Sequence, residues 1–265
     1  MELVSGIKMR KAQALELDGR PYRNNLDKII KKIAPGIDPS LSALTQVPDG
    51  AKSRELVILV TSNKGLCGSF NVNLFRFLNT LVDFKATDFL TVGKKGAGMV
   101  GRMGSVIVAD FSSIMPLNQI SAIFTLALTR FLSGEYSKIS LVYTQFISTL
   151  RSEPKYEVLL PITIDAASQE EKTDEVKIHE YVVEPSPQDI LDSLLKSFVE
   201  EKIRGAVISS EAVEHSARMI AMKNATDNAN DVIYSFTLLG NRLRQEKITN
   251  ELLDMITAKE SVESN

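Results

Sequence analysis

The middle of the chain alternates short apolar runs with longer amphipathic stretches. Runs rich in apolar and β-branched side chains predict strands that are buried on both faces, and these are residues 56–60, 89–92, 106–108 and 139–147. Apolar side chains at helical spacing predict helices over residues 71–84 and 118–132. Further short strands are expected at residues 158–160 and 176–183, separated by an acidic loop at 166–175. The alternation predicts an α/β fold with a Rossmann-like, doubly wound central domain and a mostly parallel sheet.

Both ends of the chain predict helices. Residues 1–34 are mostly good helix formers with an apolar stripe, and Pro21 should bend or briefly interrupt that helix. Residues 35–52, rich in proline, glycine, serine and threonine, predict a loop. All nine prolines lie at or before Pro187. The stretch 188–265 therefore predicts a very long helix, of roughly 110 Å at 1.5 Å per residue.

The C-terminal stretch also carries a heptad pattern. Its apolar residues are spaced 4, 3, 4, 3 and 4 positions apart, at Ala225, Ala229, Val232, Phe236, Leu239 and Leu243. The N-terminal helix is the candidate partner within the chain, and it is less than half as long. We expect a long antiparallel coiled coil formed by the N- and C-terminal helices, part of which is unpaired within the chain. The expected organisation is a coiled-coil helix at 1–34, the globular domain at 35–187 and a coiled-coil helix at 188–265.

Composition excludes several classes of function. A formal net charge of -2 argues against bulk binding of nucleic acid, which usually needs an excess of lysine and arginine. One cysteine and two histidines leave little material for a disulfide, a metal site or a catalytic triad. No apolar run approaches about 18 residues, so neither a membrane span nor a secretion signal is expected. We expect no metal and no cofactor.

Candidate catalytic and nucleotide-binding motifs are weak. Residues 96–101 satisfy the G-x-G-x-x-G pattern, but they follow the second strand, and Asp110 comes about 9 residues later instead of the roughly 20 that the fingerprint requires. A glycine-tolerant turn and helix is the structural interpretation; a Rossmann-type NAD(P)-binding oxidoreductase is the alternative. Residues 64–68 do not form a Walker A loop. We expect Cys67 to be a small buried residue and His215 to be a solvated or interface histidine.

Two long segments resemble signatures of one family. Residues 61–71 (TSNKGLCGSFN) and 216–229 (SARMIAMKNATDNA) closely resemble those of the gamma subunit of F-type ATP synthase. Residues 8–13 and 241–252 are similar to helices of the same family, so the resemblance covers nearly the whole chain. The family residues in the first segment are Gly65, Leu66, Cys67, Gly68, Phe70 and Asn71.

The resemblance implies a non-catalytic rotor. Its partners would be a hexamer of alpha and beta subunits, an epsilon subunit and a ring of c subunits, with membrane contact through the complex alone. The chain itself would bind no nucleotide. The residues expected to contact partners are Arg218, Lys223, Arg244, Gln245, Thr249 and Glu251. The implied location is the cytoplasmic face of a bacterial inner membrane.

One departure from the family concerns the N-terminus. Family members usually carry about 20 more residues before the point that matches Met1, so either the start codon is misassigned or the shaft is one-stranded over part of its length. We favour misassignment, since the seam at 225–243 would otherwise expose an apolar stripe. A coiled-coil adaptor derived from the rotor family is the remaining alternative.

Overall fold

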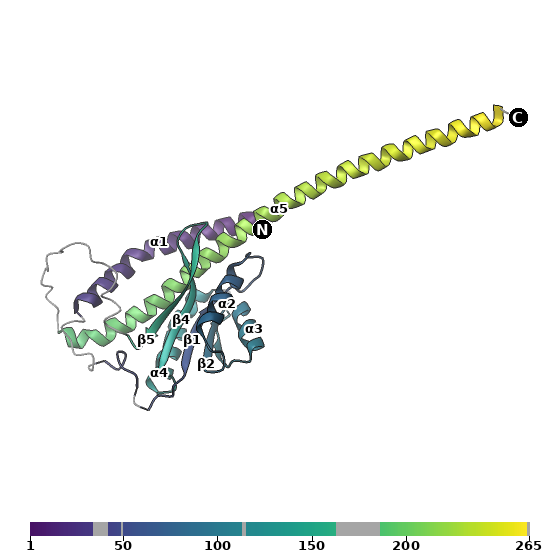
Figure 1. The fold of residues 1–265 in the computed structure, drawn as a ribbon. Coiled ribbons are helices and arrows are strands. Elements are labelled where there is room, and N and C mark those ends of the chain that lie inside the picture. Colours follow the sequence, from purple (N-terminus) through teal and green to yellow (C-terminus); the bar gives the residue numbers. More distant parts are fainter. Residues whose placement is uncertain (34–41, 49, 113–114, 163–185, 264–265) are drawn as a thin grey trace. The chain divides into compact units, whose positions relative to one another are not determined.

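The computed structural model describes residues 1–33, 42–48, 50–112, 115–162 and 186–263 (Figure 1). The chain divides into two compact units, Met1–Met219 and Ile220–Asn265. The elements in chain order are α1 (Glu2–Ile33), β1 (Glu55–Val60), α2 (Phe70–Leu81), β2 (Thr87–Val92), α3 (Lys94–Met103), β3 (Ile107–Asp110), the 3-10 turn η3 (Pro116–Gln119), α4 (Ile120–Leu132), β4 (Lys138–Phe146), β5 (Ser152–Leu160) and α5 (Pro187–Glu263).

The first unit is built on a five-stranded sheet with the order β3-β2-β1-β4-β5. The strands β1 to β4 pair in parallel, and β5 pairs antiparallel with β4. In the central pairs, Val57 lies beside Phe89 of β2, and Leu59 lies beside Val142 of β4. The chain builds the sheet outward from β1 to β3 and then returns to the other side of β1, as the doubly wound prediction requires.

Helices cover both faces of the sheet (Figure 1). Alternate residues of β1, Val57 and Leu59, pack with α2 and α3. The residues between them, including Ile58, pack with α4, α5 and the end of α1. Because β1 has no solvent-facing side, all of its residues after Glu55 are buried, which explains its continuous apolar sequence.

Helix α1 lies antiparallel to the first part of α5 within this unit (Figure 1). A Cβ added at Gly6 would lie 3.6 Å from Sδ of Met219, and one at Gly205 would lie 3.0 Å from Cδ of Arg23. Residue numbers therefore rise along α1 as they fall along α5. The predicted antiparallel pairing of the terminal helices is confirmed over this stretch. The predicted segments 1–34, 35–187 and 188–265 stay a prediction, since α1 and the start of α5 belong to the same compact unit as the sheet.

The predicted N-terminal helix is confirmed, the interruption that was one of two predicted effects of Pro21 is wrong, and the other effect, a bend, stays a prediction. Helix α1 runs from Glu2 to Ile33 with Pro21 inside it. Proline removes one backbone hydrogen bond, but Ala12 before it and Leu26 and Ile30 after it are all buried. Packing on both sides of the proline outweighs the local preference to end the helix.

The edge strand also differs from prediction. A short strand at 158–160 was expected, and β5 instead spans Ser152–Leu160. Its first part is polar and contains Pro154, which lies opposite Thr144 of β4. An edge strand tolerates proline because one side of its backbone needs no sheet partner. The predicted strand at 176–183, the acidic loop at 166–175 and residues 35–41 of the predicted loop lie outside the described residues.

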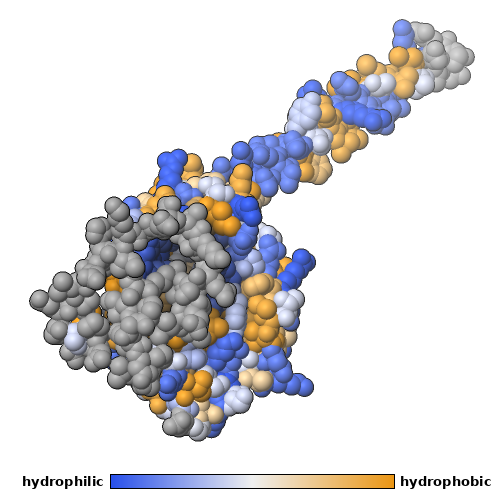
Figure 2. Space-filling model, turned by 60° about the vertical axis from the view of Figure 1, so that its left-hand side comes forward, coloured by the Kyte–Doolittle hydropathy of each residue, from blue (hydrophilic) through white to orange (hydrophobic). Residues whose placement is uncertain are grey.

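The second unit is helical from Ile220 through Glu263. Apolar residues of the predicted seam are exposed there, with Val232 at 52%, Phe236 at 67% and Leu239 at 49%. Figure 2 shows apolar and polar groups alternating along this helix. Among the described helices of the chain, none combines the length and the apolar character needed to cross a membrane.

Serine hydroxyls of α5 complete the hydrogen bonding of β4. The parallel pairing of β1 with β4 reaches Val142, and beyond it the backbone N–H of Thr144 donates to Oγ of Ser210 at 3.1 Å. The N–H of Phe146 donates to Oγ of Ser209 at 2.6 Å. Both interactions are buried, so these hydroxyls hold α5 against the end of the sheet.

We therefore expect Ser209→Ala and Ser210→Ala each to lower the free energy of unfolding by about 1–3 kcal/mol, because each leaves a buried N–H without an acceptor. Urea unfolding followed by circular dichroism measures the change. Ser193→Ala is the matched control, since this exposed serine donates to Ile190 of its own helix. An equal effect of all three substitutions would contradict the role given to Ser209 and Ser210.

Candidate functional site

The loop after β1 carries the family residues and lies at the carboxyl end of the sheet. It spans Thr61 to Ser69 and leads directly into α2 at Phe70. The strand order reverses between β1 and β4, and in open α/β sheets ligands bind outside the carboxyl ends of the strands at such a point. This is where a Rossmann-like domain would hold a nucleotide.

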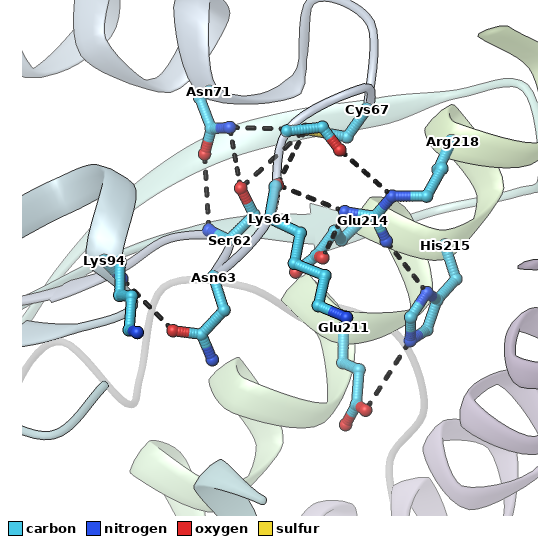
Figure 3. Close-up of polar contacts among 11 residues, drawn as sticks. Ser62, Asn63, Lys64, Cys67, Asn71, Lys94, Glu211, Glu214, His215 and Arg218 are labelled. Carbon is cyan, nitrogen blue, oxygen red and sulfur yellow. Dashed lines mark hydrogen bonds and ion pairs between the residues drawn. The ribbon is translucent and has the colours of Figure 1, made fainter. Parts of the chain in front are cut away.

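The second half of the loop is fastened by the half-buried Asn71 and by the buried Cys67 and Phe70. Asn71 donates from Nδ2 to Oγ of Ser62 at 2.8 Å and to Sγ of Cys67 at 3.3 Å, and its Oδ1 accepts from the N–H of Ser62 at 3.3 Å (Figure 3). Cys67 and Phe70 are 3% and 4% exposed and pack with Ala12, Phe146, Ala212 and Val213. The prediction that Cys67 is a small buried residue is confirmed. Gly68 has φ +56°, a conformation that suits glycine.

The start of α3, where the glycine pattern at 96–101 would place a pyrophosphate, is bonded by the loop itself. At the start of α3, the N–H of Lys94 donates to Oδ1 of Asn63 at 3.2 Å, and that of Lys95 donates to the carbonyl of Ser62 at 3.1 Å. The N–H of Gly96 donates to Oγ1 of Thr61 at 2.9 Å. In dinucleotide-binding folds the N–H groups at a helix start are free to bind phosphate. Here the N–H groups of Lys94, Lys95 and Gly96 each have an acceptor within the chain.

Of the glycines in the pattern at 96–101, Gly96 has a packing role, whereas a Cβ at Gly98 or Gly101 would meet nothing within 4 Å. These glycines lie inside α3, which begins at Lys94, and not in the strand-to-helix turn that the fingerprint requires. A Cβ at Gly96 would lie 2.7 Å from Oγ1 of Thr61, and one at Gly93 would lie 2.2 Å from its carbonyl oxygen. Small residues are needed for this close approach. The oxidoreductase alternative rested on residues 96–101 and therefore loses its basis.

Arg218 of α5 fastens the first half of the loop (Figure 3). Its Nε donates to the carbonyl of Gly65 and its Nη2 donates to the carbonyl of Lys64, both at 3.2 Å. Nη2 also pairs with Oε1 of Glu214 at 2.6 Å, and Nη1 lies 3.2 Å from Nδ1 of His215. The planar guanidinium thus joins two carbonyls, one carboxylate and one imidazole at the same time.

This cluster is buried. Arg218 is 6% exposed and His215 is 8% exposed, so of the two settings predicted for His215 the solvated one is wrong, and the interface one stays a prediction. Burial raises the pKa of Glu214, and Arg218 acts in the opposite direction through its hydrogen bond and its charge. Nε2 of His215 lies 3.7 Å from Oε1 of Glu211. The cluster is a buried ion pair with its hydrogen bonds satisfied from two parts of the fold.

The remaining predicted partner-contact residues lie in the second unit and are exposed. They are Lys223, Arg244, Gln245, Thr249 and Glu251. Oγ1 of Thr249 donates to the carbonyl of Gln245 at 2.9 Å, and Glu251 lies 3.7 Å from Lys247. Their contacts with partners stay predictions. Of the predicted residues, the structure brings Arg218 together with Gly65 and its neighbours in the loop.

Sequence reasoning missed Glu214 and the capping residues Thr61 and Asn63. The spacing of Glu214 and Arg218, four positions apart on a helix, is a readable signal for an ion pair. No comparable signal exists for the contact between Arg218 and Lys64, which are 154 positions apart. Across the described residues, no group of three or more histidine, cysteine, aspartate or glutamate side chains could hold a metal ion.

We expect Arg218→Met to destabilise the first unit in a pH-dependent way. The pKa of Glu214 rises further without the guanidinium, because burial then acts unopposed. Below about pH 4.3 the Glu214 carboxyl is protonated in both the folded and the unfolded variant, so it carries no charge that burial could penalise. As the pH rises, Glu214 ionises readily in the unfolded variant but not in the folded one. The variant's loss in free energy of unfolding should therefore grow to about 3 kcal/mol at pH 7.

Urea unfolding at pH 4, 5.5 and 7 measures this loss. Arg102→Met is the control, because exposed Arg102 donates to the carbonyl of Gly98 in its own helix. A loss of stability that does not change with pH would contradict the pairing of Glu214 with Arg218.

Comparison with known proteins identifies the family. The family model described as ATP synthase matches residues 1–262. The ATP synthase gamma chain of Akkermansia muciniphila is 34% identical over 99% of this chain and 92% of that protein. The ATP synthase gamma chain of Verminephrobacter eiseniae is 36% identical over 97% of this chain and 89% of that protein.

Solved structures share the fold. The central stalk and c-ring structure of the Tetrahymena thermophila mitochondrial ATP synthase contains a chain that aligns with TM-score 0.61 and 22% identity, over 85% of this chain and 97% of that one. A chain of the Euglena gracilis mitochondrial ATP synthase aligns with TM-score 0.60 and 16% identity, over 97% of this chain and 95% of that one. The family-model match and the gamma chain relatives extend over nearly the whole sequence, and the chain therefore belongs to the ATP synthase gamma chain family.

Proposed function

We propose that this chain is the central rotor shaft of an F-type ATP synthase and has no catalytic activity of its own. The observation that carries the proposal is the long helix α5, 77 residues from Pro187 to Glu263, in a member of the gamma chain family. Its exposed apolar residues, such as Phe236 and Leu243, need surrounding protein to cover them. A stiff helix enclosed by other subunits fits the role of a shaft.

The proposed partners are the alpha and beta subunits of a catalytic hexamer, an epsilon subunit and the ring of c subunits. Ion flow would turn the ring and the shaft together. A shaft without threefold symmetry presents different contacts to three equivalent catalytic sites, so their nucleotide affinities shift in turn as it rotates. The chain would bind neither nucleotide nor nucleic acid. The expectation that it binds no nucleotide is supported by the start of α3, where the N–H groups of Lys94 and Gly96 donate to side chains of the loop.

We assign the contacts with the beta subunits to exposed polar residues of the second unit, namely Lys223, Arg244, Gln245, Thr249 and Glu251. The guanidinium of Arg244 can form a bidentate pair with a carboxylate, and the Gln245 amide can both donate and accept. Such charge-assisted bonds give a rotating surface a few strong and specific points of contact.

The proposed location is the cytoplasmic face of a bacterial inner membrane, where the chain would be peripheral and would touch the membrane through the complex. The bacterial gamma chains among its relatives support this location.

The decisive experiment is reconstitution with cognate alpha and beta subunits. We expect the wild-type chain to give an active ATPase and the double variant Arg244→Ala/Gln245→Ala to lower ATP hydrolysis about tenfold, which corresponds to about 1.4 kcal/mol of lost transition-state stabilisation. Arg102→Ala, which removes one exposed arginine from α3, is the control and should leave hydrolysis unchanged. Copurification without ATPase activity would instead favour a coiled-coil adaptor.

Continuity of the shaft can be tested at Gly240. A Cβ at this position meets nothing within 4 Å, so Gly240→Ala should strengthen the helix by about 1 kcal/mol. Gly240→Pro should weaken it by about 3 kcal/mol relative to alanine and speed amide hydrogen exchange around the site. We expect the assembled proline variant to lose ATP-driven proton pumping more than ATP hydrolysis. Equal exchange rates in the two variants would argue against a continuous rod at this position.

A further inference from the structure

The first unit contains a polar pocket that is lined by residues of α1, β4, β5 and α5. Its volume is about 320 Å³, at the lower end of the range for small-molecule sites. Its charged residues are four cations and four anions, namely Arg20, Arg23, Lys155 and Lys202, and Glu16, Asp27, Glu157 and Glu201. Because these formal charges balance, the hydrogen bonds that each group already makes decide which kind of ligand the pocket favours.

Two of the carboxylates are committed to arginines. Glu16 is 6% exposed, and it accepts from Nε of Arg20 at 3.3 Å and from Nη2 of Arg23 at 2.9 Å. Glu201 accepts from Nε of Arg204, on its own helix, at 2.9 Å. These two carboxylates therefore have little capacity left to attract a cationic ligand.

The third carboxylate, Glu157, lies near two lysines without forming a hydrogen bond to either. Its Oε1 accepts from the buried Tyr143 hydroxyl at 2.8 Å, and Nζ of Lys155 lies 3.7 Å from the same oxygen. Nζ of Lys202 lies 4.0 Å from Oε2 of Glu157 and 5.2 Å from the centre of the Phe198 ring. Both N–O distances exceed the length of an N–H···O hydrogen bond. Two ammonium groups from different elements thus have donors that the carboxylate leaves unused.

Arg23 also has unused donors. A Cβ at Gly205 of α5 would lie 3.0 Å from Cδ of Arg23, and one at Gly19 would lie 2.7 Å from its Nη1, so the two glycines leave room for this side chain. The side chain is 18% exposed, and its bonds to Glu16 use Nη2 alone. Within the described part of the chain, Nε and Nη1 of Arg23 have no acceptor. The pocket therefore offers donors to a ligand on the side of α1 as well.

We propose that this pocket binds a small molecule that carries a phosphate group, held by Arg23 of α1, Lys155 of β5 and Lys202 of α5. Unused donors on cations select an anion. A planar carboxylate would be satisfied by one arginine fork, whereas donors from three elements suit the tetrahedral oxygens of a phosphate. The Asp27 carboxylate has no partner among the described residues and can accept from a hydroxyl group of the same ligand.

Calorimetric titration of the full chain with glycerol 3-phosphate, at pH 7 and constant ionic strength, tests the site. We expect Lys155→Gln and Lys202→Gln each to raise the dissociation constant about tenfold, because each removes one charge-assisted bond. Lys196→Gln is the matched control and should leave the constant unchanged. It removes a lysine of α5 that pairs with Asp192 at 2.6 Å and lies outside the pocket lining.

Inorganic phosphate, as a second probe, identifies the source of the phosphate group. Weaker binding than that of glycerol 3-phosphate supports a phosphate ester as the ligand, and equal binding supports recognition of the phosphate group alone. Both results keep the proposed site.

Glu157→Gln separates a binding site from a purely structural set of ion pairs. Glutamine can still accept from the Tyr143 hydroxyl, but the substitution removes the negative charge near Lys155 and Lys202. Because that charge repels the phosphate and attracts the same two lysines, we expect the dissociation constant to fall about fivefold. Weaker binding by this variant would contradict the proposal.

Urea unfolding guards against variants that fail to fold. The side chains of Lys155 and Lys202 are 45% and 35% exposed, so their variants should unfold without ligand at nearly the wild-type midpoint. Glycerol 3-phosphate should raise the midpoint of the wild type and leave that of the double variant Lys155→Gln/Lys202→Gln unchanged. A wild-type chain that binds neither probe would overturn the proposal, as would binding that both lysine variants leave intact. These measurements use the chain alone, so their outcome does not depend on the rotor function.

Discussion

The structure depends on the packing of α5 against the sheet. Ile203 and Ala212 of this helix are fully buried, and its serines supply acceptors for the N–H groups of β4 beyond β1. The same helix then continues without proline into a unit whose apolar residues are exposed. Its first part is stabilised by packing within the first unit, whereas apolar side chains of the rest, such as Phe236, are exposed in the described part of the chain. This division is what a shaft fixed at one end to its own domain requires.

The fold also uses, within the chain, polar groups that the glycine pattern at 96–101 would offer to a nucleotide. The doubly wound order places a crevice at the carboxyl ends of β1 and β4. In the loop after β1, oxygen atoms of Thr61, Ser62 and Asn63 accept hydrogen bonds from the first N–H groups of α3. Arg218 donates to the carbonyls of Lys64 and Gly65. Polar groups that would bind a ligand in a related architecture instead bind one another. The bonds of Arg218 form a joint between this loop and α5.

Much of this architecture could be predicted from local pattern. The strands β1 and β2 are buried on both faces and so have continuous apolar sequence, and α5 could be expected from the absence of proline after Pro187. Predictions from the local sequence pattern are wrong where tertiary packing overrides local preference. Pro21 sits inside α1 because the helix is buried on both sides of it, and β5 accepts Pro154 because it is an edge strand. The bonds of Arg218 join residues far apart in sequence, and no periodicity encodes such contacts.

The choice of arginine for this joint has a physical reason. A neutral donor would hold the loop carbonyls but would leave the buried Glu214 without a counter-charge. A lysine would supply the charge as a single point and could not reach two carbonyls and a carboxylate in one plane. Arginine does both, and it keeps its charge at every physiological pH. The Arg218–Glu214 pair lies within α5, and the same guanidinium donates to the loop carbonyls of Gly65 and Lys64, so one side chain both neutralises the carboxylate and holds the loop against the helix.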